Sequence, residues 1–490
     1  MLSVTLFRGV LNAAGSLLLP LFSGPAYDAV WWLAGCGVVV AGRSRRLAPF
    51  GDWMNRQPER LPTSNERPTV QIAGSGFGGF HAARELERRL PAEAADIVLA
   101  SPDDHLTYGP LLPNVAAGVI EPRHVAVALH GELRRTRYLT GALTALDIPG
   151  RTGTLSDSDG KVASVPWNRL ILAPGAVTRL PSIPGLAEHA LGLKTMTAAI
   201  ALRDHVIRQL NLADATDDPA ERRARATFVV VGAGYTGVEA AAQLQLFSRR
   251  AVRKFPRLRR SDLRWVLVDV ADQVLAEIGP FLGRRALAVL RRRGMQVRLW
   301  TTVEEVTEDA VRLSDGETLR SYTLIWAAGV KPEPVIEQLG LPLEKGRLRV
   351  EATLRVPGVE GVYALGDAAA VPDLTRPGQF TAPTAQHAQR QGRAVARNVA
   401  ASLGYGTERP YRHHDLGQAV DLGPFSAVAR PLGLPLWGLP AALVTRGYHL
   451  LALPSAAGRV RVLLGWLLDL VVPPQLSRVG RTSPAGRIPA

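Results

Sequence analysis

The chain has 490 residues, of which 47% are hydrophobic and 21% charged, and its formal net charge is +15. This length supports two or three domains, and the composition is that of a folded globular protein. The positive charges lie in predicted helical stretches and near the C-terminus, which favours anionic cofactors or an anionic membrane surface as partners, with no nucleic acid. The single cysteine, Cys36, excludes an internal disulfide and the paired cysteines of disulfide reductases.

Residues 1–66 are predicted to be an apolar N-terminal segment followed by a polar linker. Ala29–Gly42 is strongly apolar and Arg43 follows it directly, which indicates a membrane anchor. This run is shorter than the roughly 20 residues of a spanning helix. The alternative is a translation start at Met54, which would make residues 1–53 a start-site artefact.

The first chemical motif is a short apolar strand, Val70–Ala73, that runs into Gly-x-Gly-x-x-Gly and then into a predicted helix. Gly74 permits the tight turn, Gly76 lets the backbone approach a pyrophosphate, and Gly79 lets the helix pack on the strand. Phe77 lies inside the motif, where the helix N-terminus offers amides to phosphates. This pattern predicts a dinucleotide cradle.

The next strand, Asp96–Ala100, normally ends in an acidic residue that binds the ribose of the dinucleotide. Ser101 stands at that position, and Asp103 follows shortly after. We therefore expect either the Ser101 hydroxyl or the Asp103 carboxylate to bind the ribose.

A second cradle repeats the pattern about 160 residues later. Phe228–Val231 forms the strand, and Gly232, Gly234 and Gly237 have the same spacing. Two cradles in one chain indicate two bound dinucleotides, with electrons passing from a nicotinamide to a flavin.

The strand that follows the second cradle ends in Asp269. A carboxylate there accepts hydrogen bonds from both ribose hydroxyls of NADH and repels the 2′-phosphate of NADPH. NADH is therefore the predicted substrate of this half, and a simple strand-end cap is the alternative role for Asp269.

A third element, the apolar strand Val362–Leu365, ends in Gly366 and Asp367. With both cradles, it makes the chain resemble the two-dinucleotide-domain flavoproteins, and among them the type II NADH dehydrogenases, over roughly residues 68–472. The resemblance implies FAD in the first cradle, NADH in the second, and Asp367 beside the ribityl-phosphate region of FAD.

The same resemblance implies roles for four further residues. Two apolar strands resemble those that cross between the FAD and NADH domains, and they end at Gly175 and Gly329; Pro174 stands where the family more often has threonine. Pro110 belongs to a loop that passes beside the isoalloxazine ring. Glu239 lies at the nicotinamide–flavin contact, and stabilisation of the helix dipole is its alternative role.

The helix opening at Ala385 resembles the quinone-site signature Ala-Gln-x-Ala-x-Gln. Gln386 matches the first glutamine, whereas Arg390 replaces the second. The resemblance implies that the Gln386 amide hydrogen-bonds a quinone carbonyl. Arg390 either does so with charge assistance or turns toward solvent.

Residues 401–490 are predicted to form a membrane-docking region. Within Pro431–Val472, apolar stretches that contain Trp437 and Trp466 alternate with charged residues, a pattern that excludes a spanning helix and suits helices lying in the membrane interface. A dimer interface or a buried helix pair is the alternative, so the sequence leaves open whether the protein forms a homodimer.

Together these observations predict an α/β protein with two Rossmann-like domains. The FAD-binding domain comprises 67–190 and 345–400, and the NADH-binding domain, 225–344, is inserted in it. The expected function is non-proton-pumping transfer of electrons from NADH through FAD to a membrane quinone, on the cytoplasmic face of the cell membrane. The rivals are a soluble NADH-dependent flavin or ferredoxin-type reductase and an NADH-sensing flavoprotein without turnover.

Overall fold

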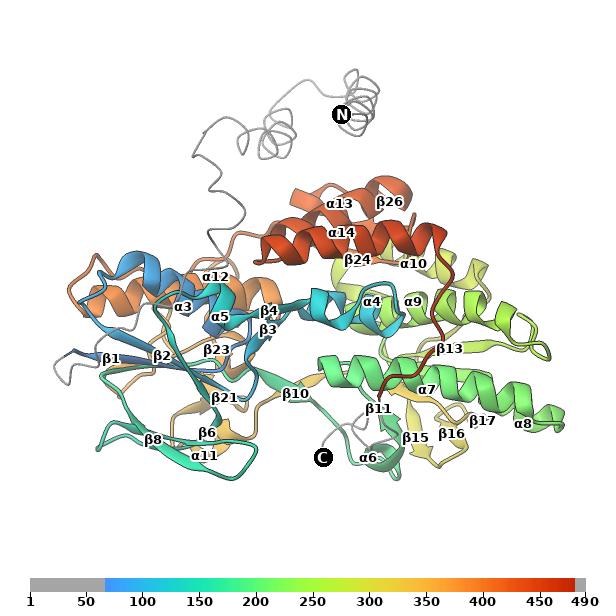
Figure 1. Cartoon of the computed structure of the whole chain (residues 1–490), viewed down its shortest axis with the longest axis horizontal. Helices are drawn as coiled ribbons and strands as arrows, with labels where there is room; N and C mark the ends of the chain where they lie inside the picture. Colours follow the sequence, from blue (N-terminus) through green and yellow to red (C-terminus); the bar gives the residue numbers. More distant parts are fainter. Residues whose placement is uncertain (1–66, 481–490) are drawn as a thin grey trace, which may run out of the picture. The chain divides into compact units, whose positions relative to one another are not determined.

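Two parallel β-sheets organise residues 67–480, the part of the chain that the computed structural model describes (Figure 1). The predicted N-terminal anchor lies outside these residues. The first sheet has the order β22-β9-β1-β2-β5, and each neighbouring pair is parallel. Its strands are β1 (Thr69–Ala73), β2 (Asp96–Ser101), β5 (Arg137–Thr140), β9 (Arg169–Leu172) and β22 (Val362–Ala364).

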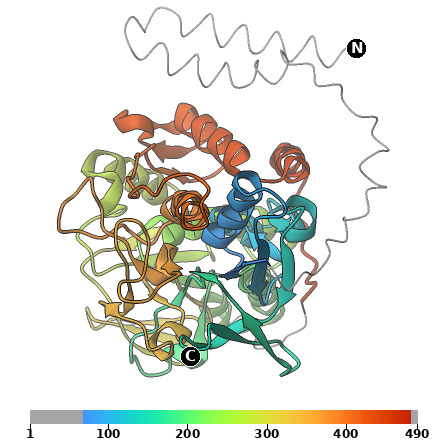
Figure 2. The same cartoon turned by 90° about the vertical axis from the view of Figure 1, so that its left-hand side faces the viewer.

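The first sheet is covered on both faces. Consecutive strand residues point to opposite sides, and Ile72 faces helix α3 (Phe77–Arg89), while Gln71 faces a three-stranded antiparallel sheet. That small sheet comprises β6 (Ala142–Asp147), β7 (Thr152–Ser156) and β8 (Val162–Pro166). Helix α12 (Ala385–Ser402) packs on α3, as Figure 2 shows. Their backbones are so close that a Cβ at Gly392 would lie 2.3 Å from the Gly78 carbonyl oxygen.

The second sheet, in the order β11-β18-β12-β13-β14, is also parallel throughout. In sequence it lies between β9 and β22, so it is inserted in the first sheet. Its edge strand β11 lies ahead of residue 225, the predicted start of the NADH-binding domain. The strands are β11 (Ala190–Leu191), β12 (Thr227–Val231), β13 (Arg264–Val268), β14 (Gln296–Arg298) and β18 (Leu324–Trp326), and the long helices of this part are α7 (Met196–Ala215), α9 (Tyr235–Ala251) and α10 (Pro280–Arg292).

The chain crosses between the two sheets twice. β10 (Ala176–Thr178) follows the first crossing point, β19 (Val330–Pro332) follows the second, and the two pair as an antiparallel ribbon. Gly175 and Gly329, which precede these strands, have φ angles of +86° and +80°. Glycine is required there because other residues rarely adopt this left-handed conformation.

The remaining elements are short. The strands are β3 (His105–Thr107), β4 (Ala126–Ala128), β15 (Val303–Val306), β16 (Ala310–Leu313), β17 (Thr318–Arg320), β20 (Leu343–Glu344), β21 (Arg347–Arg349) and β23 (Ala369–Ala370). The helices are α4 (Leu112–Ala116), α5 (Leu129–Glu132), α6 (Leu186–His189), α8 (Pro219–Arg225) and α11 (Val335–Gln338), with 3-10 turns that include η2 (Gly109–Leu111) and η6 (Gly366–Ala368).

The C-terminal region forms a small sheet and two helices. The sheet comprises β24 (Ala419–Asp421), β25 (Ala427–Ala429) and β26 (Leu436–Trp437), and it leads into α13 (Gly438–Ala452) and α14 (Ala456–Val471). Within residues 67–480, no helix has both the length and the apolar character that crossing a membrane requires.

After α14 the chain runs back along α7 (Figure 1). Arg203 donates to the carbonyl oxygen of Gln475 at 2.9 Å, and the Asp204 carboxylate accepts the N–H groups of Val479 at 3.1 Å and Gly480 at 2.6 Å. These bonds hold the end of the C-terminal region against α7.

Candidate active site

The first glycine turn has the shape of a phosphate cradle. Gly74 has φ +105°, and a Cβ there would lie 2.2 Å from the Ala173 carbonyl oxygen. A Cβ on Gly79 would lie 1.8 Å from the Gly74 carbonyl oxygen, so the helix can approach the strand only because this residue is glycine. A Cβ on Gly76 would meet no protein atom within 4 Å, and this open side lies at the N-terminus of α3. The turn therefore fits a dinucleotide pyrophosphate, as FAD binding requires.

The second turn reproduces this geometry. Gly232 has φ +111° and a Cβ there would lie 2.8 Å from the Ala327 carbonyl oxygen, while a Cβ on Gly237 would lie 1.8 Å from the Gly232 carbonyl oxygen. Gly234, like Gly76, has open space on its Cβ side. The second turn thus fits a second pyrophosphate at the N-terminus of α9.

Asp269 lies at the mouth of the second cradle. Its Oδ2 atom accepts the N–H of Ala233, inside the glycine turn, and its Oδ1 atom accepts the N–H of Ala271 at 2.7 Å. Each carboxylate oxygen keeps a further lone pair for a ribose hydroxyl. The side chain is therefore held in place and can still bind the ribose of NADH.

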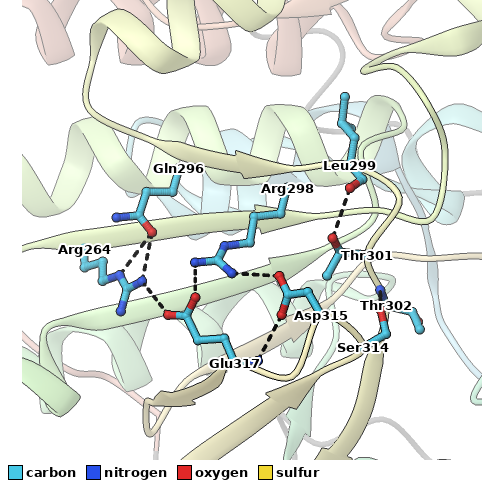
Figure 3. A network of polar contacts seen from close by, with 9 residues as sticks. All are labelled: Arg264, Gln296, Arg298, Leu299, Thr301, Thr302, Ser314, Asp315 and Glu317. Carbon is cyan, nitrogen blue, oxygen red and sulfur yellow. Dashed lines mark hydrogen bonds and ion pairs between the residues drawn. The ribbon is translucent and has the colours of Figure 1, made fainter.

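Arg298, at the end of β14, has its guanidinium engaged elsewhere (Figure 3). Its backbone carbonyl accepts the Asp269 N–H at 3.0 Å, but its side chain binds Asp315 at 2.9 Å and also Glu317. Arg264 binds the same Glu317 at 3.1 Å. Because these ion pairs occupy the Arg298 guanidinium, it is not available to bind a 2′-phosphate at the second cradle.

Gly366 and Asp367 follow β22 at the same edge of the first sheet as the first cradle. The Gly366 N–H donates to Oε1 of Gln391, a fully buried side chain of α12, at 2.7 Å. The Asp367 carboxylate lies 3.6 Å from the ammonium group of Lys194. This places a carboxylate and a lysine together where the carboxyl ends of the parallel strands meet, the usual position of a ligand in such sheets.

A buried polar cluster lies between the two cradles. Tyr108 packs edge-on against Phe77 of the first cradle, with ring centroids 5.6 Å apart, and its hydroxyl lies 3.2 Å from Nδ1 of His449. Glu239, in α9 after the second cradle, accepts the backbone N–H of Asp421 on Oε1 at 2.7 Å. Burial raises the pKa of Glu239 well above its usual range, and it lowers the pKa of His449 to about 4. Residues from both cradles and from α13 therefore meet in one region that is shielded from water.

Comparisons with known proteins identify this arrangement. A family model for pyridine nucleotide-disulphide oxidoreductases matches residues 68–392. The type II NADH:quinone oxidoreductase Ndh of Mycobacterium tuberculosis is 31% identical over 432 residues, which cover 84% of this chain and 91% of that protein. The chain belongs to the type II NADH:quinone oxidoreductase family. The demethylphylloquinone reductase NdbB of Synechocystis is 30% identical over 417 residues, covering 82% of this chain and 96% of that one.

A solved structure supports the fold of this type II oxidoreductase. NDH2 from Plasmodium falciparum in complex with NADH has a TM-score of 0.78, with 17% sequence identity, and the match covers 84% of this chain and 99% of that one. The α/β architecture with two dinucleotide-binding sheets, predicted from the sequence, is confirmed.

Ser101, the predicted ribose ligand of this type II oxidoreductase, has its hydroxyl engaged inside the protein. It lies 2.8 Å from the Ser75 hydroxyl and is 3% exposed, and it accepts the N–H of Asp103 at 3.3 Å. Ser75 in turn reaches the carbonyl oxygen of His105 at 3.2 Å. The serine pair fastens β2 to the first glycine turn, and the ribose contact of Ser101 stays a prediction.

The two residues of the predicted quinone signature both contact the segment that precedes β24. The Gln386 amide donates to the carbonyl oxygen of Gly417 at 3.0 Å, and it also hydrogen-bonds Tyr448 of α13. Arg390 donates to Nδ1 of His413 at 3.1 Å and to the carbonyl oxygen of His414. Arg390 is therefore engaged with protein groups, and a part for either side chain in quinone binding stays a prediction.

The other predicted residues lie along the two cradles. Pro110 is in the 3-10 turn η2, directly after the buried Tyr108. Gly175 has open space on its Cβ side, while Gly329 lies against the side chain of Arg179. Sequence reasoning missed Lys194, Tyr108, Asp421 and His449, none of which belongs to a glycine motif; the position of Tyr108 two residues before Pro110 was the available signal for one of them.

A separate cavity of about 1040 Å³ lies between α7 and the strands β15 to β18. The residues that line it include Asp204, His205 and Arg225 but none from either cradle. This cavity is therefore separate from the candidate site formed by the two cradles. Among residues 67–480, no cluster of His, Cys, Asp or Glu side chains could hold a metal ion.

Proposed function

We propose that this protein oxidises NADH and passes the electrons through FAD to a membrane quinone. The observation that carries the proposal is the pair of glycine cradles, each open above its middle glycine, with one buried polar cluster between them. The single cysteine leaves no pair of thiols for disulfide chemistry. Relatives that share about 30% identity over most of the chain are named as quinone-reducing enzymes.

FAD would be held by residues 67–190 and 345–400. When bound, FAD supplies the capacity to accept two electrons from a hydride and to release them to a second acceptor. The Gly76 turn and the N-terminus of α3 would stabilise the phosphates of FAD. Asp367 and Lys194 would lie at the other end of the FAD site. These groups bind and orient the cofactor without any covalent step.

NADH would be held by residues 225–344. The Gly234 turn takes the pyrophosphate, and the Asp269 carboxylate accepts hydrogen bonds from the ribose hydroxyls. The engaged Arg298 supports NADH over NADPH, since a free arginine would be needed to bind a 2′-phosphate. Glu239 and Tyr108 then line the region toward which both nucleotides extend.

The quinone would be bound near the N-terminus of α12. Gln386 has an amide suited to a quinone carbonyl, and its contacts with Gly417 and Tyr448 fix its position. The Arg390 guanidinium donates a hydrogen bond to His413 and so holds the loop that contains His413 beside this proposed site. This assignment rests on the resemblance of the helix to the family signature and on these contacts.

The membrane contact would be the apolar face of α13 and α14, peripheral to the bilayer. The exposed apolar residues of these helices and of the segments directly next to them are Leu432, Leu434, Trp437, Leu439, Leu443, Leu451, Val460, Leu463, Leu464, Leu467, Leu468, Leu470, Val471 and Val472. On the other side of α14, Val462 and Trp466 are buried against the protein. Such a face suits the membrane interface, where an inserted leucine contributes about 1.5 kcal/mol or more, and a homodimer contact is the competing use.

The central experiment is NADH oxidation by the purified protein with a panel of quinones, in detergent and in liposomes. We expect turnover that depends on both NADH and quinone, with a tightly bound FAD. Turnover with a soluble dye or a ferredoxin but with no quinone would instead favour a soluble reductase. Binding of NADH without turnover by any acceptor would favour a sensor.

The docking face is tested by substitution, because a deletion would also remove buried Trp466. Leu464→Asp combined with Leu468→Asp should release the protein from liposomes that contain anionic lipid, and it should leave NADH-driven dye reduction unchanged. The matched control is Val162→Asp, since Val162 is exposed on the small sheet of the first domain. Liposome binding equal to wild type in the double variant would argue against this face.

A further inference from the structure

Three neighbouring strands of the inserted sheet end side by side at the second cradle. β12, β13 and β14 are adjacent in this order and both pairs are parallel, so their carboxyl ends lie along one edge of the sheet. Gly232 follows β12, Asp269 follows β13, and Trp300 lies two residues after β14. A ligand that extends along this edge from β12 to β14 would meet the glycine turn, then the Asp269 carboxylate and then Trp300.

The adenosine half of NADH has its chemical groups in the same order. The pyrophosphate is bonded to C5′ of the adenosine ribose, and the adenine ring is bonded to C1′ of that ribose. With the pyrophosphate at the Gly234 turn and the ribose hydroxyls at Asp269, the adenine would extend past β13 toward the end of β14. Neighbouring strands lie about 4.8 Å apart, so the adenine would need to extend by one strand only.

Hydrogen bonds between the segments that follow β13 and β14 hold Trp300 beside Asp269. The Asp269 N–H donates to the carbonyl oxygen of Arg298 at 3.0 Å, and the Thr301 N–H donates to the carbonyl oxygen of Asp269 at 3.0 Å. Between these two bonds, the Trp300 N–H donates to the carbonyl oxygen of Ala271 at 3.1 Å. The backbone of Trp300 is therefore fixed next to the residue that is expected to bind the ribose.

Packing within the protein does not explain a tryptophan at position 300. Trp300 is 76% exposed, and Val270, on the neighbouring segment, is 65% exposed. Trp300 also has a φ angle of +58°, a left-handed conformation that a bulky residue rarely adopts and that costs free energy. An exposed indole with a strained backbone, beside a second exposed apolar residue, indicates a surface that a ligand covers.

We propose that Trp300 stacks against the adenine ring of bound NADH, with Val270 as a second apolar contact. The indole is a large flat ring, and stacking of a base on an aromatic side chain strengthens binding about 5- to 150-fold, which corresponds to about 1–3 kcal/mol. Trp300 thus sets the affinity for the adenosine half of NADH and has no part in hydride transfer. This inference rests on the proposed function and deepens it.

The first test is direct binding of ADP-ribose to the FAD-loaded protein by calorimetry. ADP-ribose contains the adenosine and the pyrophosphate but no nicotinamide, so it cannot reduce the flavin. Trp300→Ala should bind it about 5- to 150-fold more weakly, and Trp300→Phe, which keeps an aromatic face, should stay within about threefold of wild type. The matched control is Tyr405→Ala, since Tyr405 is an exposed aromatic residue after α12.

Three results of this titration would overturn the proposal. Equal affinity of Trp300→Ala and wild type would show that the indole does not touch the adenosine half. Equal affinity of Trp300→Leu and Trp300→Phe would show that an aromatic ring is not needed. A loss in Tyr405→Ala as large as that in Trp300→Ala would show that removal of any exposed aromatic residue has this effect.

The second test compares NADH with reduced nicotinamide mononucleotide, NMNH, in anaerobic stopped-flow reduction of the bound flavin. NMNH supplies the same hydride but lacks the adenosine. In Trp300→Ala the NADH concentration for half-maximal reduction should rise about 5- to 150-fold, while the maximal rate and the efficiency with NMNH stay at wild-type values. An equal fall in efficiency with both substrates would contradict a contact with adenine.

Trp300→Gly separates binding from folding. Glycine adopts a positive φ readily, so this variant removes the indole and the backbone strain together. We expect ADP-ribose binding as weak as in Trp300→Ala, with a urea midpoint of unfolding no lower than that of wild type. A lower midpoint with unchanged ADP-ribose affinity would show that the indole serves the fold, and it would overturn the proposal.

These experiments also distinguish the inference from the function on which it rests. If NADH reduces the flavin of the wild type but no quinone reoxidises it, the proposed function fails, and the Trp300 variants still decide the inference. If the wild type reduces quinone but Trp300→Ala keeps the wild-type affinity for ADP-ribose and NADH, only the inference fails.

Discussion

The two cradles have the same backbone and different side chains. In each, the first glycine has a positive φ, the third allows helix and strand to touch, and the middle one is open. At equivalent positions, however, the first cradle has Ser101 and His81 where the second has Asp269 and Glu239. The glycines thus give both turns the shape of a phosphate site, and we expect these paired positions to decide what each half can do.

His81 and Glu239 show this difference most directly. Both lie two residues beyond the third glycine and both are buried. Burial and the neighbouring Arg393 and Arg84 lower the pKa of His81 to about 3, whereas burial raises the pKa of Glu239. Burial thus favours the neutral form of both side chains, but only the neutral form of Glu239 carries a proton that it can release as a carboxylic acid.

The largest expected effect comes from blocking the open side of each cradle. Gly76→Val should lose FAD, and Gly234→Val should keep FAD but bind NADH at least about tenfold more weakly, since each charged hydrogen bond to a phosphate contributes about 1.5–3 kcal/mol. Flavin absorbance per protein and NADH titration measure the two effects. Gly131→Val, at an open position in α5, is the control. Full flavin content in Gly76→Val would contradict the assignment of the first cradle.

Asp269→Ser, which gives the second cradle the residue type of the first, should relax the choice of nucleotide. The lost carboxylate costs about 1–3 kcal/mol of NADH binding, and repulsion of a 2′-phosphate disappears with it. The ratio of kcat/KM for NADH and NADPH should therefore fall roughly tenfold or more. Asp272→Asn, at an exposed acid nearby, should leave the ratio unchanged. An unchanged ratio in Asp269→Ser would reduce Asp269 to a strand-end cap.

Glu239 and His81 should affect stability with opposite dependence on pH. Above its ordinary value of 4.5, Glu239 is protonated in the folded state but ionised in the unfolded state, so the free energy of unfolding falls as pH rises. Below 6.5, His81 is neutral when folded and protonated when unfolded, so stability falls as pH drops toward about 3.

Urea denaturation at several pH values tests both signs. The stability of Glu239→Gln relative to wild type should increase as pH rises, and that of His81→Gln should increase as pH falls, each by up to about 1.4 kcal/mol per pH unit. Parallel profiles for wild type and either variant would show that its group titrates alike in the folded and unfolded states.

The smallest effect is expected at the serine pair of the first cradle. Ser101→Ala should lower the free energy of unfolding by about 1 kcal/mol, because the Ser75 hydroxyl loses a buried partner. Ser75→Ala and the double variant Ser75→Ala/Ser101→Ala complete a double-mutant cycle, which measures the coupling free energy between the two hydroxyls. FAD affinity should change less than in Gly76→Val. A large loss of FAD with unchanged stability would instead support Ser101 as a ribose ligand.

The cradles could be predicted from the sequence because their geometry is local. Gly74, Gly76 and Gly79 act within one turn, and the strand that carries Asp269 ends where the pattern of apolar residues ends. Such motifs need no knowledge of distant parts of the chain.

The buried cluster could not be predicted in this way. Tyr108 meets His449 across 341 positions, Trp466 meets Asn114 across 352, and Asp421 meets Glu239 across 182. No spacing in the sequence marks these pairs, because the partners are brought together only when α13, α14 and β24 pack on the two sheets. The same holds for Arg390, whose engagement with His413 depends on a loop of irregular structure.

The insertion of the second sheet in the first has a consequence for synthesis on the ribosome. β1, β2, β5 and β9 emerge early, but β22, the last strand of their sheet, emerges only after the whole inserted sheet. Domains generally fold as units during synthesis. The inserted sheet can therefore complete its hydrogen bonds while the nascent first sheet still has an unpaired edge at β9. The site that we propose for FAD would stay incomplete until Gly366 and Asp367 have been translated.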